Sequence, residues 1–469
     1  GIPYAAPPVG PLRWQAPRLA PRWADVRPAT EYGGRCAQLA SGNGPEADGE
    51  DCLYLNVYTP VDHNEGSLPV LLMIHGGGLV NGAGDQHDGS MIAGASHIVV
   101  VSINYRLGPL GFLTVPGLNG SALTRAGNFG FLDQQAALRW VHRNIAAFGG
   151  DPARVTVDGE SAGGFSVCAL LTSPLAAGLF RAAIIQSGGC ASQPPALAER
   201  SGLAFARQAG CPEPSTAARC LRGLPARKLL RAASGYLTAF TSGGPDLPVP
   251  VAQAIDDGSY TRVPVLIGAN HDEGRGFSQA FANYTGQQYR ILVAALYGSR
   301  APGVLARYPL SAYPKRYAAA YAIGDIFTDS GFLLGIGGCP TQNLVSRLAA
   351  TTRTWFYQFD DVHAPGLNRD LPGYQWGAAH AMELAYLWPG FGNGYSLYDL
   401  LTAAQRELSR QMVRYWGAFT TLGTPDVPGQ PYWPGYLSGR IMSLRPGGHT
   451  QLIGSATYSA EHMCSFWNR

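Results

Sequence analysis

Apolar residues follow two alternating patterns along the chain. Short, nearly continuous apolar runs end in glycine or polar residues, which is typical of parallel strands covered on both faces. Between them, residues 131–148 place apolar side chains on one helical face up to Gly149-Gly150, and residues 402–421 show a similar spacing. The runs expected to form strands are 69–74, 98–103, 155–160, 182–188, 263–268 and 354–359, together with the alternating segment 50–58. This alternation predicts an α/β fold, an open sheet with helices on both faces.

The domain organisation follows from the same pattern. No linker, repeat or low-complexity tract divides the 469 residues. The apolar pattern weakens after residue 190, where short helical segments alternate with proline and glycine turns. We therefore expect one domain over residues 1–469, in which residues 190–340 contribute a cap and the walls of a pocket.

Composition and charge exclude several functions. Hydrophobic residues make up 46% of the chain, charged residues 14%, and the net charge is only +3. A charge this small does not favour nucleic acid or an anionic membrane surface as a partner. No apolar run reaches the roughly 18 residues of a membrane-spanning helix, and no Cys-x-x-Cys or paired-histidine spacing indicates a metal site. We expect neither a metal nor a cofactor; the oligomeric state is open, with a monomer favoured.

The eight cysteines favour an oxidising compartment. The expected pairs are Cys36 with Cys52, Cys211 with Cys220, and Cys339 with Cys464. Cys168 and Cys190 are left over in apolar surroundings, either as free buried thiols or as a fourth bridge. Because the chain opens at Gly1 as if earlier residues had been removed, we expect a secreted protein.

One stretch combines a strand, a tight turn and the start of a helix. A β-branched strand, expected to begin after Pro152, leads into Gly159-Glu160-Ser161-Ala162-Gly163, and an apolar run follows. In this context Gly-x-Ser-x-Gly forms a nucleophile elbow, where the serine backbone is strained and a Cβ on either glycine would collide. A chance match is the alternative in a chain with 61 glycines. The surrounding pattern makes Ser161 the candidate nucleophile.

A serine nucleophile needs an oxyanion site, a base and an acid. Gly76-Gly77-Gly78 follows a buried strand, and its N–H groups, together with that of Ala162, are candidates for the oxyanion hole. The alternative is a plain glycine-rich turn. Beside the elbow, the oxyanion interpretation is favoured.

The order nucleophile, acid, histidine restricts the base and the acid. The histidines that remain are His271, His363, His380, His449 and His462. His380 is the first candidate because its small neighbours would let the ring reach the elbow, although a histidine among alanines is usually a core residue. The acid is expected after the strand that ends at Gly268, and Asp272 and Glu273 are both candidates there. An exposed acidic turn is the commoner explanation of such a segment, and position alone does not choose between the two carboxylates.

Longer motifs are spread over nearly the whole chain. They are Gly1-Ile2-Pro3-Tyr4-Ala5, Pro7-Pro8-Val9-Gly10, Glu50-Asp51-Cys52-Leu53-Tyr54-Leu55-Asn56-Val57, Asn104-Tyr105-Arg106-Leu107-Gly108, Gly127-Asn128-Phe129-Gly130, Phe148-Gly149-Gly150-Asp151-Pro152 and the elbow itself. Jointly they resemble type B carboxylesterases, the cholinesterase-like branch of the α/β hydrolases. Glu383-Leu384 is similar to the bacterial esterase subgroup. The resemblance implies an α/β-hydrolase fold, with a large mixed, mostly parallel sheet flanked by helices and with cap insertions.

The resemblance also implies roles for individual residues. Carried over by position, Ser161 is the nucleophile, His380 the base, and Glu273 rather than Asp272 the acid. The implied oxyanion donors are Gly77, Gly78 and Ala162, and Glu160 and Ser187 are expected to support the triad. Cys36–Cys52 corresponds to the family's first disulfide, and Arg13 with Glu50 to a structural ion pair.

Two departures from the family pattern affect the expectations. The loop between Cys36 and Cys52 contains no aromatic residue, whereas cholinesterases hold a tryptophan there that binds choline by cation–π contact. Choline esters are therefore not expected as dedicated substrates. The chain also begins later than members of the family usually do, so an N-terminal strand or hairpin is expected to be missing.

The function expected from these residues is hydrolysis of carboxylic esters through an acyl-enzyme on Ser161, with broad specificity for small to medium or aryl esters. The aromatic residues Phe240, Phe277, Tyr284 and Tyr321 would either favour such esters or pack the cap. Transfer of the acyl group to an alcohol or amine by the same triad is the first alternative. The second is a non-catalytic binding module, which the presence of Ser161, Glu273 and His380 disfavours.

Overall fold

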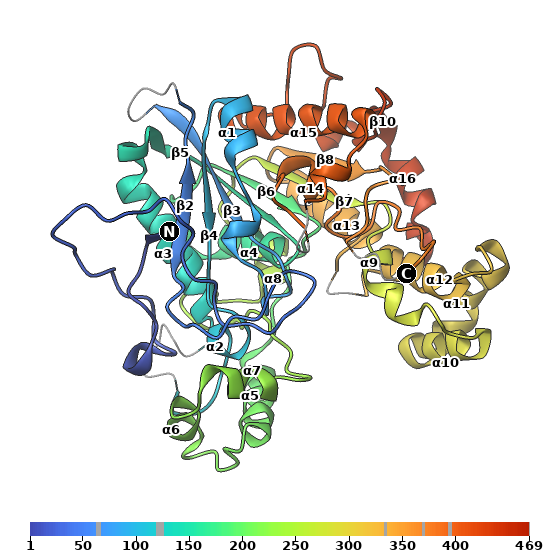
Figure 1. Cartoon of the computed structure of the whole chain (residues 1–469). Coiled ribbons are helices and arrows are strands. Elements are labelled where there is room, and N and C mark those ends of the chain that lie inside the picture. Colours follow the sequence, from blue (N-terminus) through green and yellow to red (C-terminus); the bar gives the residue numbers. More distant parts are fainter. Residues whose placement is uncertain (62–66, 119–125, 333–334, 368–370, 393–395, 469) are drawn as a thin grey trace.

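The computed structural model describes residues 1–61, 67–118, 126–332, 335–367, 371–392 and 396–468. In this part of the chain ten strands form one sheet in the order β1-β2-β4-β3-β5-β6-β7-β8-β9-β10 (Figure 1). The seven central strands from β4 to β9 run parallel, and antiparallel pairs stand at both edges. The strands are β1 Ile2–Pro3, β2 Tyr54–Tyr58, β3 Leu68–Ile74, β4 Val99–Ile103, β5 Gly150–Glu160, β6 Ala182–Gln186, β7 Val265–Asn270, β8 Thr354–Phe359, β9 Arg440–Leu444 and β10 Gln451–Gly454.

Helices cover both faces of this sheet. In β3 every residue is buried, because Val70, Leu72 and Ile74 pack into one core cluster and Leu71 and Met73 into another on the opposite face. The helices that cover the faces are α1 Ser90–Ser96, α3 Phe129–Asn144, α4 Ala162–Thr172, α13 Gly338–Ala349, α14 Leu384–Leu387 and α15 Ala403–Leu422. A continuous apolar strand is the consequence of being covered twice.

Further helices stand away from the sheet in two groups. In Figure 1, α5–α7 (green) lie below the sheet and α10–α12 (yellow) lie at its side. The remaining helices are α2 Gly108–Gly111, α5 Pro195–Gln208, α6 Ala217–Arg222, α7 Ala226–Ala232, α8 Val251–Asp256, α9 Arg275–Ser278, α10 Gly286–Tyr297, α11 Ala301–Arg307, α12 Ala318–Ser330, α16 Ser455–Glu461 and α17 Cys464–Trp467. Within the described ranges, no helix is both long and apolar enough to cross a membrane.

Several boundaries differ from the sequence-based expectation. The elbow strand β5 begins at Gly150 and passes through Pro152, although it was expected to start after that proline. Helix α3 ends at Asn144 and a 3-10 turn continues to Phe148, because Gly149, with φ +82°, closes the helix. Strand β6 stops at Gln186, since Ser187 adopts φ +46°. Strands β1, β9 and β10 had not been expected: β1 has two residues and β10 four, and β9 mixes Arg440 and Ser443 with apolar residues.

The eight cysteines all lie in the described part of the chain and form four disulfides. The bridges are Cys36–Cys52, Cys168–Cys190, Cys211–Cys220 and Cys339–Cys464. The structure thus joins Cys168 to Cys190, which the sequence had left as either free thiols or a fourth bridge. Four disulfides indicate an oxidising compartment.

Candidate active site

Ser161 stands on a strained turn between β5 and α4. Its φ is +55° and its ψ −120°, a conformation that a non-glycine residue adopts rarely and mostly at functional sites. The flanking glycines are required by space: a Cβ on Gly159 would lie 2.4 Å from the backbone of Gly163, and a Cβ on Gly163 would lie 1.9 Å from the carbonyl oxygen of Ile74. The chain therefore forms the geometry of a nucleophile elbow at this serine.

His380 and Glu273 are brought together from segments more than 100 residues apart. His380 Nδ1 lies 2.6 Å from Glu273 Oε2, and the other oxygen of Glu273 accepts the N–H of Asn270 at 2.8 Å. Both side chains are buried. A histidine held at Nδ1 by a buried carboxylate is fixed in orientation, with Nε2 left for chemistry.

The competing acid and histidines have other partners. Asp272 accepts the N–H of Ala378 at 3.0 Å and pairs with Arg275 at 3.1 Å, so its carboxylate points away from His380. His271 lies beside Asp272, and His462 lies between Asp329 and Gln358. His271 and Asp272 also form a pair, at 3.2 Å, but neither lines the cavity of Ser161, whereas His380, the partner of Glu273, does.

The Ser161 hydroxyl is not yet engaged by this pair. Within the described residues, Ser161 makes no side-chain hydrogen bond to His380, and the imidazole Nε2 lies 3.2 Å from Glu160 Oε1. Catalytic hydrogen bonds are often long or misaligned before substrate binds. Ser161 and His380 nevertheless line one cavity.

Three backbone N–H groups face the same cavity as Ser161. Gly77 and Gly78 adopt φ values of +97° and +63° and line the cavity with Ala162. Among the described residues, the N–H groups of these three donate no hydrogen bond. Unpaired donors beside a nucleophile are the arrangement that stabilises an oxyanion.

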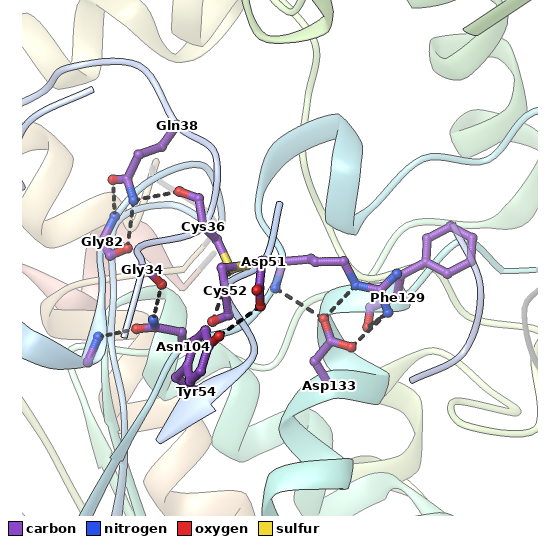
Figure 2. Close-up of a disulfide and its surroundings, with 12 residues drawn as sticks. Gly34, Cys36, Gln38, Asp51, Cys52, Tyr54, Gly82, Asn104, Phe129 and Asp133 are labelled. Atoms are coloured by element: carbon purple, nitrogen blue, oxygen red, sulfur yellow. Dashed lines mark hydrogen bonds and ion pairs between the residues drawn. A yellow bond between two sulfur atoms is a disulfide. The ribbon is translucent and has the colours of Figure 1, made fainter. Parts of the chain in front are cut away.

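The loop closed by the Cys36–Cys52 disulfide supports the turn that carries Gly77 and Gly78. Gln38 is fully buried and exchanges hydrogen bonds with the backbone of Gly82, its Nε2 donating at 3.0 Å and its Oε1 accepting at 2.9 Å. Figure 2 shows these bonds next to the Cys36–Cys52 bridge. Farther along the loop, Asn43 donates to Asn81 at 2.7 Å. The loop thus fixes the turn that carries Gly77 and Gly78.

The cavity has a volume of about 630 Å³. Its walls are mainly apolar, and the aromatic or aliphatic side chains include Phe165, Leu197, Leu237, Phe240, Phe277, Ile336, Leu384 and Phe391. Of the four aromatic residues considered from the sequence, Phe240 and Phe277 line the cavity. Tyr284 packs among the α10–α12 helices, and Tyr321 stacks on Tyr374. The size suits a drug-sized ligand.

Buried carboxylates dominate the electrostatics around His380. Burial alone would lower the pKa of the imidazole, but Glu160 and Glu273 outweigh burial and raise this pKa to about 9. Burial also raises the pKa of Glu160 well above its usual value, although His380 opposes this rise. The Glu160–His380 pair therefore retains a proton through the neutral range.

Two further acids near His380 and Glu273 were not assigned a role from the sequence. Glu383 accepts a hydrogen bond from Asn270 at 2.5 Å, and burial together with Glu273 raises its pKa to about 7. Asp158, on β5, is fully buried, and neither of its oxygens has a hydrogen-bond partner among the described residues. Burial raises the pKa of Asp158 well above its usual value. The sequence could have indicated Asp158, because a charged residue there directly follows the β-branched run Val155-Thr156-Val157.

The supporting residues take different positions. Ser187 is buried and its N–H donates to Gly268 at 2.8 Å, but its hydroxyl has no partner among the described residues. Gln186, immediately before it, accepts the N–H of Ser161 at 2.9 Å. Arg13 and Glu50 form an ion pair, with Nε 2.7 Å from Oε2, and do not line the cavity of Ser161. In the described part of the chain, no group of three or more histidine, cysteine or acidic side chains could hold a metal ion.

Comparison with known proteins gives a consistent result. Residues 1–467 match the sequence profile of the carboxylesterase family. The fumonisin B1 esterase of Sphingopyxis macrogoltabida is 35% identical, over 95% of this chain and 82% of its own length. The para-nitrobenzyl esterase of Bacillus subtilis (strain 168) is 36% identical, over 93% of this chain and 88% of its own. A solved structure of a PNB esterase superposes with a TM-score of 0.79 at 33% identity, covering 98% of this chain and 95% of that chain.

Proposed function

The chain belongs to the carboxylesterase family and is a serine hydrolase of carboxylic esters, and on this premise we propose that Ser161, His380 and Glu273 are its catalytic triad. The family and the α/β-hydrolase fold inferred from the sequence are thereby confirmed. The observation that carries the proposed triad is the buried 2.6 Å contact between His380 Nδ1 and Glu273 Oε2, beside a strained serine that lines the same cavity. No finding supports acyl transfer or a non-catalytic role.

The reaction starts with attack of the Ser161 hydroxyl oxygen on the ester carbonyl. His380 Nε2 takes the hydroxyl proton, and Glu273 holds the ring by accepting the Nδ1 proton and stabilises the imidazolium that forms. The carbonyl oxygen becomes negative and accepts the free N–H groups of Gly77, Gly78 and Ala162. His380 then donates its proton to the leaving alcohol, and the acyl-enzyme on Ser161 remains.

Hydrolysis of the acyl-enzyme repeats these steps with water. His380 removes a proton from water, the hydroxide adds to the acyl carbonyl, and the same three N–H groups stabilise the oxyanion. Ser161 leaves as the His380 proton returns to it, and the carboxylic acid is released. The steps need only side chains that the site contains.

The cavity supports small to medium or aryl esters without a charge as substrates. About 630 Å³ is available, and among the described residues that line it there is no lysine or arginine that would attract an anionic substrate. Phe240 and Phe277 give apolar surface for an aryl or alkyl group. We further propose secretion and a monomeric protein, the first supported by the four disulfides.

Replacement of the nucleophile tests the proposal. Ser161→Ala should lower kcat for p-nitrophenyl acetate by about a thousandfold or more, with the fold intact by circular dichroism. Ser346→Ala is the matched control, because the Ser346 hydroxyl on α13 contacts the carbonyl of Gln342 and the hydroxyl of Tyr436, and Ser346 does not line the cavity. Mass spectrometry after reaction with a fluorophosphonate should place the label on the peptide of Ser161. Wild-type rates in Ser161→Ala, or a label elsewhere, would refute the assignment.

A further inference from the structure

The fourth disulfide joins the nucleophile helix to the wall of the cavity. Cys168 lies on α4, seven positions after Ser161 along the chain, and is fully buried. Cys190 lies in the loop that follows β6, and the two are bridged. The residues directly after Cys190, from 191 to 194, all line the cavity. The Cys168–Cys190 disulfide is therefore attached directly before residues that line the cavity.

The loop before Cys190 is pressed against the start of α4. A Cβ on Gly188 would lie 2.6 Å from the backbone of Gly164, and a Cβ on Gly164 would lie 2.9 Å from Gly188. The backbones therefore touch with no side chain between them. From this contact to the disulfide, the loop is held to the helix at both ends.

A second cavity segment is attached to the first. The N–H of Gln193 donates to the carbonyl of Phe240 at 2.8 Å, and the N–H of Ser242 donates to the carbonyl of Gln193 at 3.0 Å. Residues 237–240 line the cavity as well. The two segments, 191–194 and 237–240, are called here the bridged wall, because a shift of the first must move the second.

The bridged wall faces the acyl side of the ester. In the proposed mechanism His380 protonates the leaving alcohol, so the alcohol lies beside this ring, whose aromatic neighbour is Phe277 at a centroid distance of 4.8 Å. The acyl group is then left with the side of the cavity that α4 and the bridged wall form, where Phe165 and Phe240 lie. The position of this wall decides how bulky an acyl group can be.

We propose that the Cys168–Cys190 disulfide is a specificity-determining element of the ester site, which fixes the bridged wall against the nucleophile helix and so limits the bulk of the acyl group. This inference rests on the proposed function. In the oxidised protein the wall cannot move away from Ser161, and bulky acyl groups are excluded. When the bridge is absent, the non-covalent contacts alone hold the wall, so it can yield to a larger acyl group while Ser161, His380 and the oxyanion donors stay in place.

The test is removal of this bridge and, separately, of a bridge that does not touch the cavity. In Cys168→Ala/Cys190→Ala, kcat/KM for p-nitrophenyl acetate should stay within threefold of wild type, while the preference for acetate over the pivalate and benzoate esters falls at least fivefold, mainly through KM. In the control Cys211→Ala/Cys220→Ala, a bridge between the end of α5 and α6 is lost, and the preference should not change.

Three results would overturn the inference: an unchanged preference in the Cys168/Cys190 variant, an equal change in the control, or loss of acetate hydrolysis in a folded variant. If the double variant does not fold, graded reduction of the native enzyme, with alkylation and mass spectrometry of the peptides of Cys168 and Cys190, gives the same comparison. The preference for acetate should then fall as the reduced fraction of the Cys168–Cys190 disulfide rises, and it should return on reoxidation. A preference that does not change with this fraction contradicts the proposal. Failure of the proposed function itself is a separate result, because wild type would then hydrolyse none of these esters.

Discussion

The pKa of His380 gives a prediction that can be worked out in numbers. Its rise from the ordinary 6.5 to about 9 corresponds to about 3 kcal/mol of extra stabilisation of the protonated imidazole, since each pH unit is worth about 1.4 kcal/mol. Catalysis needs the neutral ring, so activity is lost as pH falls through this raised pKa. At neutral pH the protonated ring is therefore favoured over the neutral base.

Glu160→Gln should reverse part of this rise. The Coulomb attraction across the 3.2 Å between Glu160 Oε1 and His380 Nε2 is roughly 5 kcal/mol at an effective dielectric constant of about 20. Burial raises the pKa of Glu160 as well, although His380 lowers it, so the charge on Glu160 is worth less than the full attraction. Even a quarter of the attraction is worth about 1 pH unit. We expect the midpoint of the acid limb to move down by about that amount.

The assay is kcat/KM for p-nitrophenyl acetate between pH 5 and pH 10, corrected for spontaneous hydrolysis. Glu407→Gln is the matched control, because Glu407 is exposed on α15 and pairs with Arg410, and its midpoint should equal that of wild type. The plateau rate of Glu160→Gln should fall, since Glu160 also stabilises the imidazolium. A midpoint that stays in place or moves up in Glu160→Gln would refute the reasoning, because Glu160 would then be holding its own proton throughout.

Two other substitutions test the scaffold beneath the site. Gly163→Ala should cost roughly 2–4 kcal/mol of stability and lower kcat more than tenfold, because the new Cβ would lie 1.9 Å from the Ile74 carbonyl oxygen. The control is Gly94→Ala, where a Cβ meets nothing within 4 Å, and thermal melts of this variant should show neutral or slightly raised stability. Equal melting temperatures of the two variants would contradict the steric argument. Burial raises the pKa of Asp158, so Asp158 keeps its proton in the folded state at pH values where the unfolded chain has lost it. The stability of the wild type therefore falls as pH rises above the ordinary pKa of 3.8. Asp158→Asn should reduce this loss of stability between pH 5 and pH 8. Parallel curves of melting temperature against pH for the two proteins would show that Asp158 is already ionised in the fold.

The central strands could be predicted because burial on both faces leaves a continuous apolar run. β3 is such a strand, with every residue buried. β9 and β10 escaped prediction because neither is a continuous apolar run, and their place in the sheet depends on pairing with β8 and with each other. The start of β5 was misplaced because Pro152 suggests a break, whereas this end of the strand is tolerant of proline.

The site shows the same division between local and long-range information. The need for glycine on both sides of Ser161 could be predicted from the local turn alone. The choice between Asp272 and Glu273, in contrast, depends on which way two adjacent side chains point. The structure turns Asp272 to the N–H of Ala378 and to Arg275, and neither partner is recognisable from spacing. The Cys168–Cys190 bridge requires knowing that the loop after β6 crosses the start of α4. Such a crossing leaves no periodic trace in the sequence.

Sheet register places one of the acids that surround His380. Glu160 is paired in register with Gln186, Gln186 with Gly268, and Gly268 with Tyr357, so these four positions form one row across β5, β6, β7 and β8. A Cβ on Gly268 would lie 2.3 Å from the Tyr357 ring, which shows that the ring leans over this glycine towards β6. Asp158, two positions before Glu160, points to the same face of the sheet because strand side chains alternate. The register of the sheet thus fixes the position of Glu160, whose charge, together with that of Glu273 from the loop after β7, raises the pKa of His380.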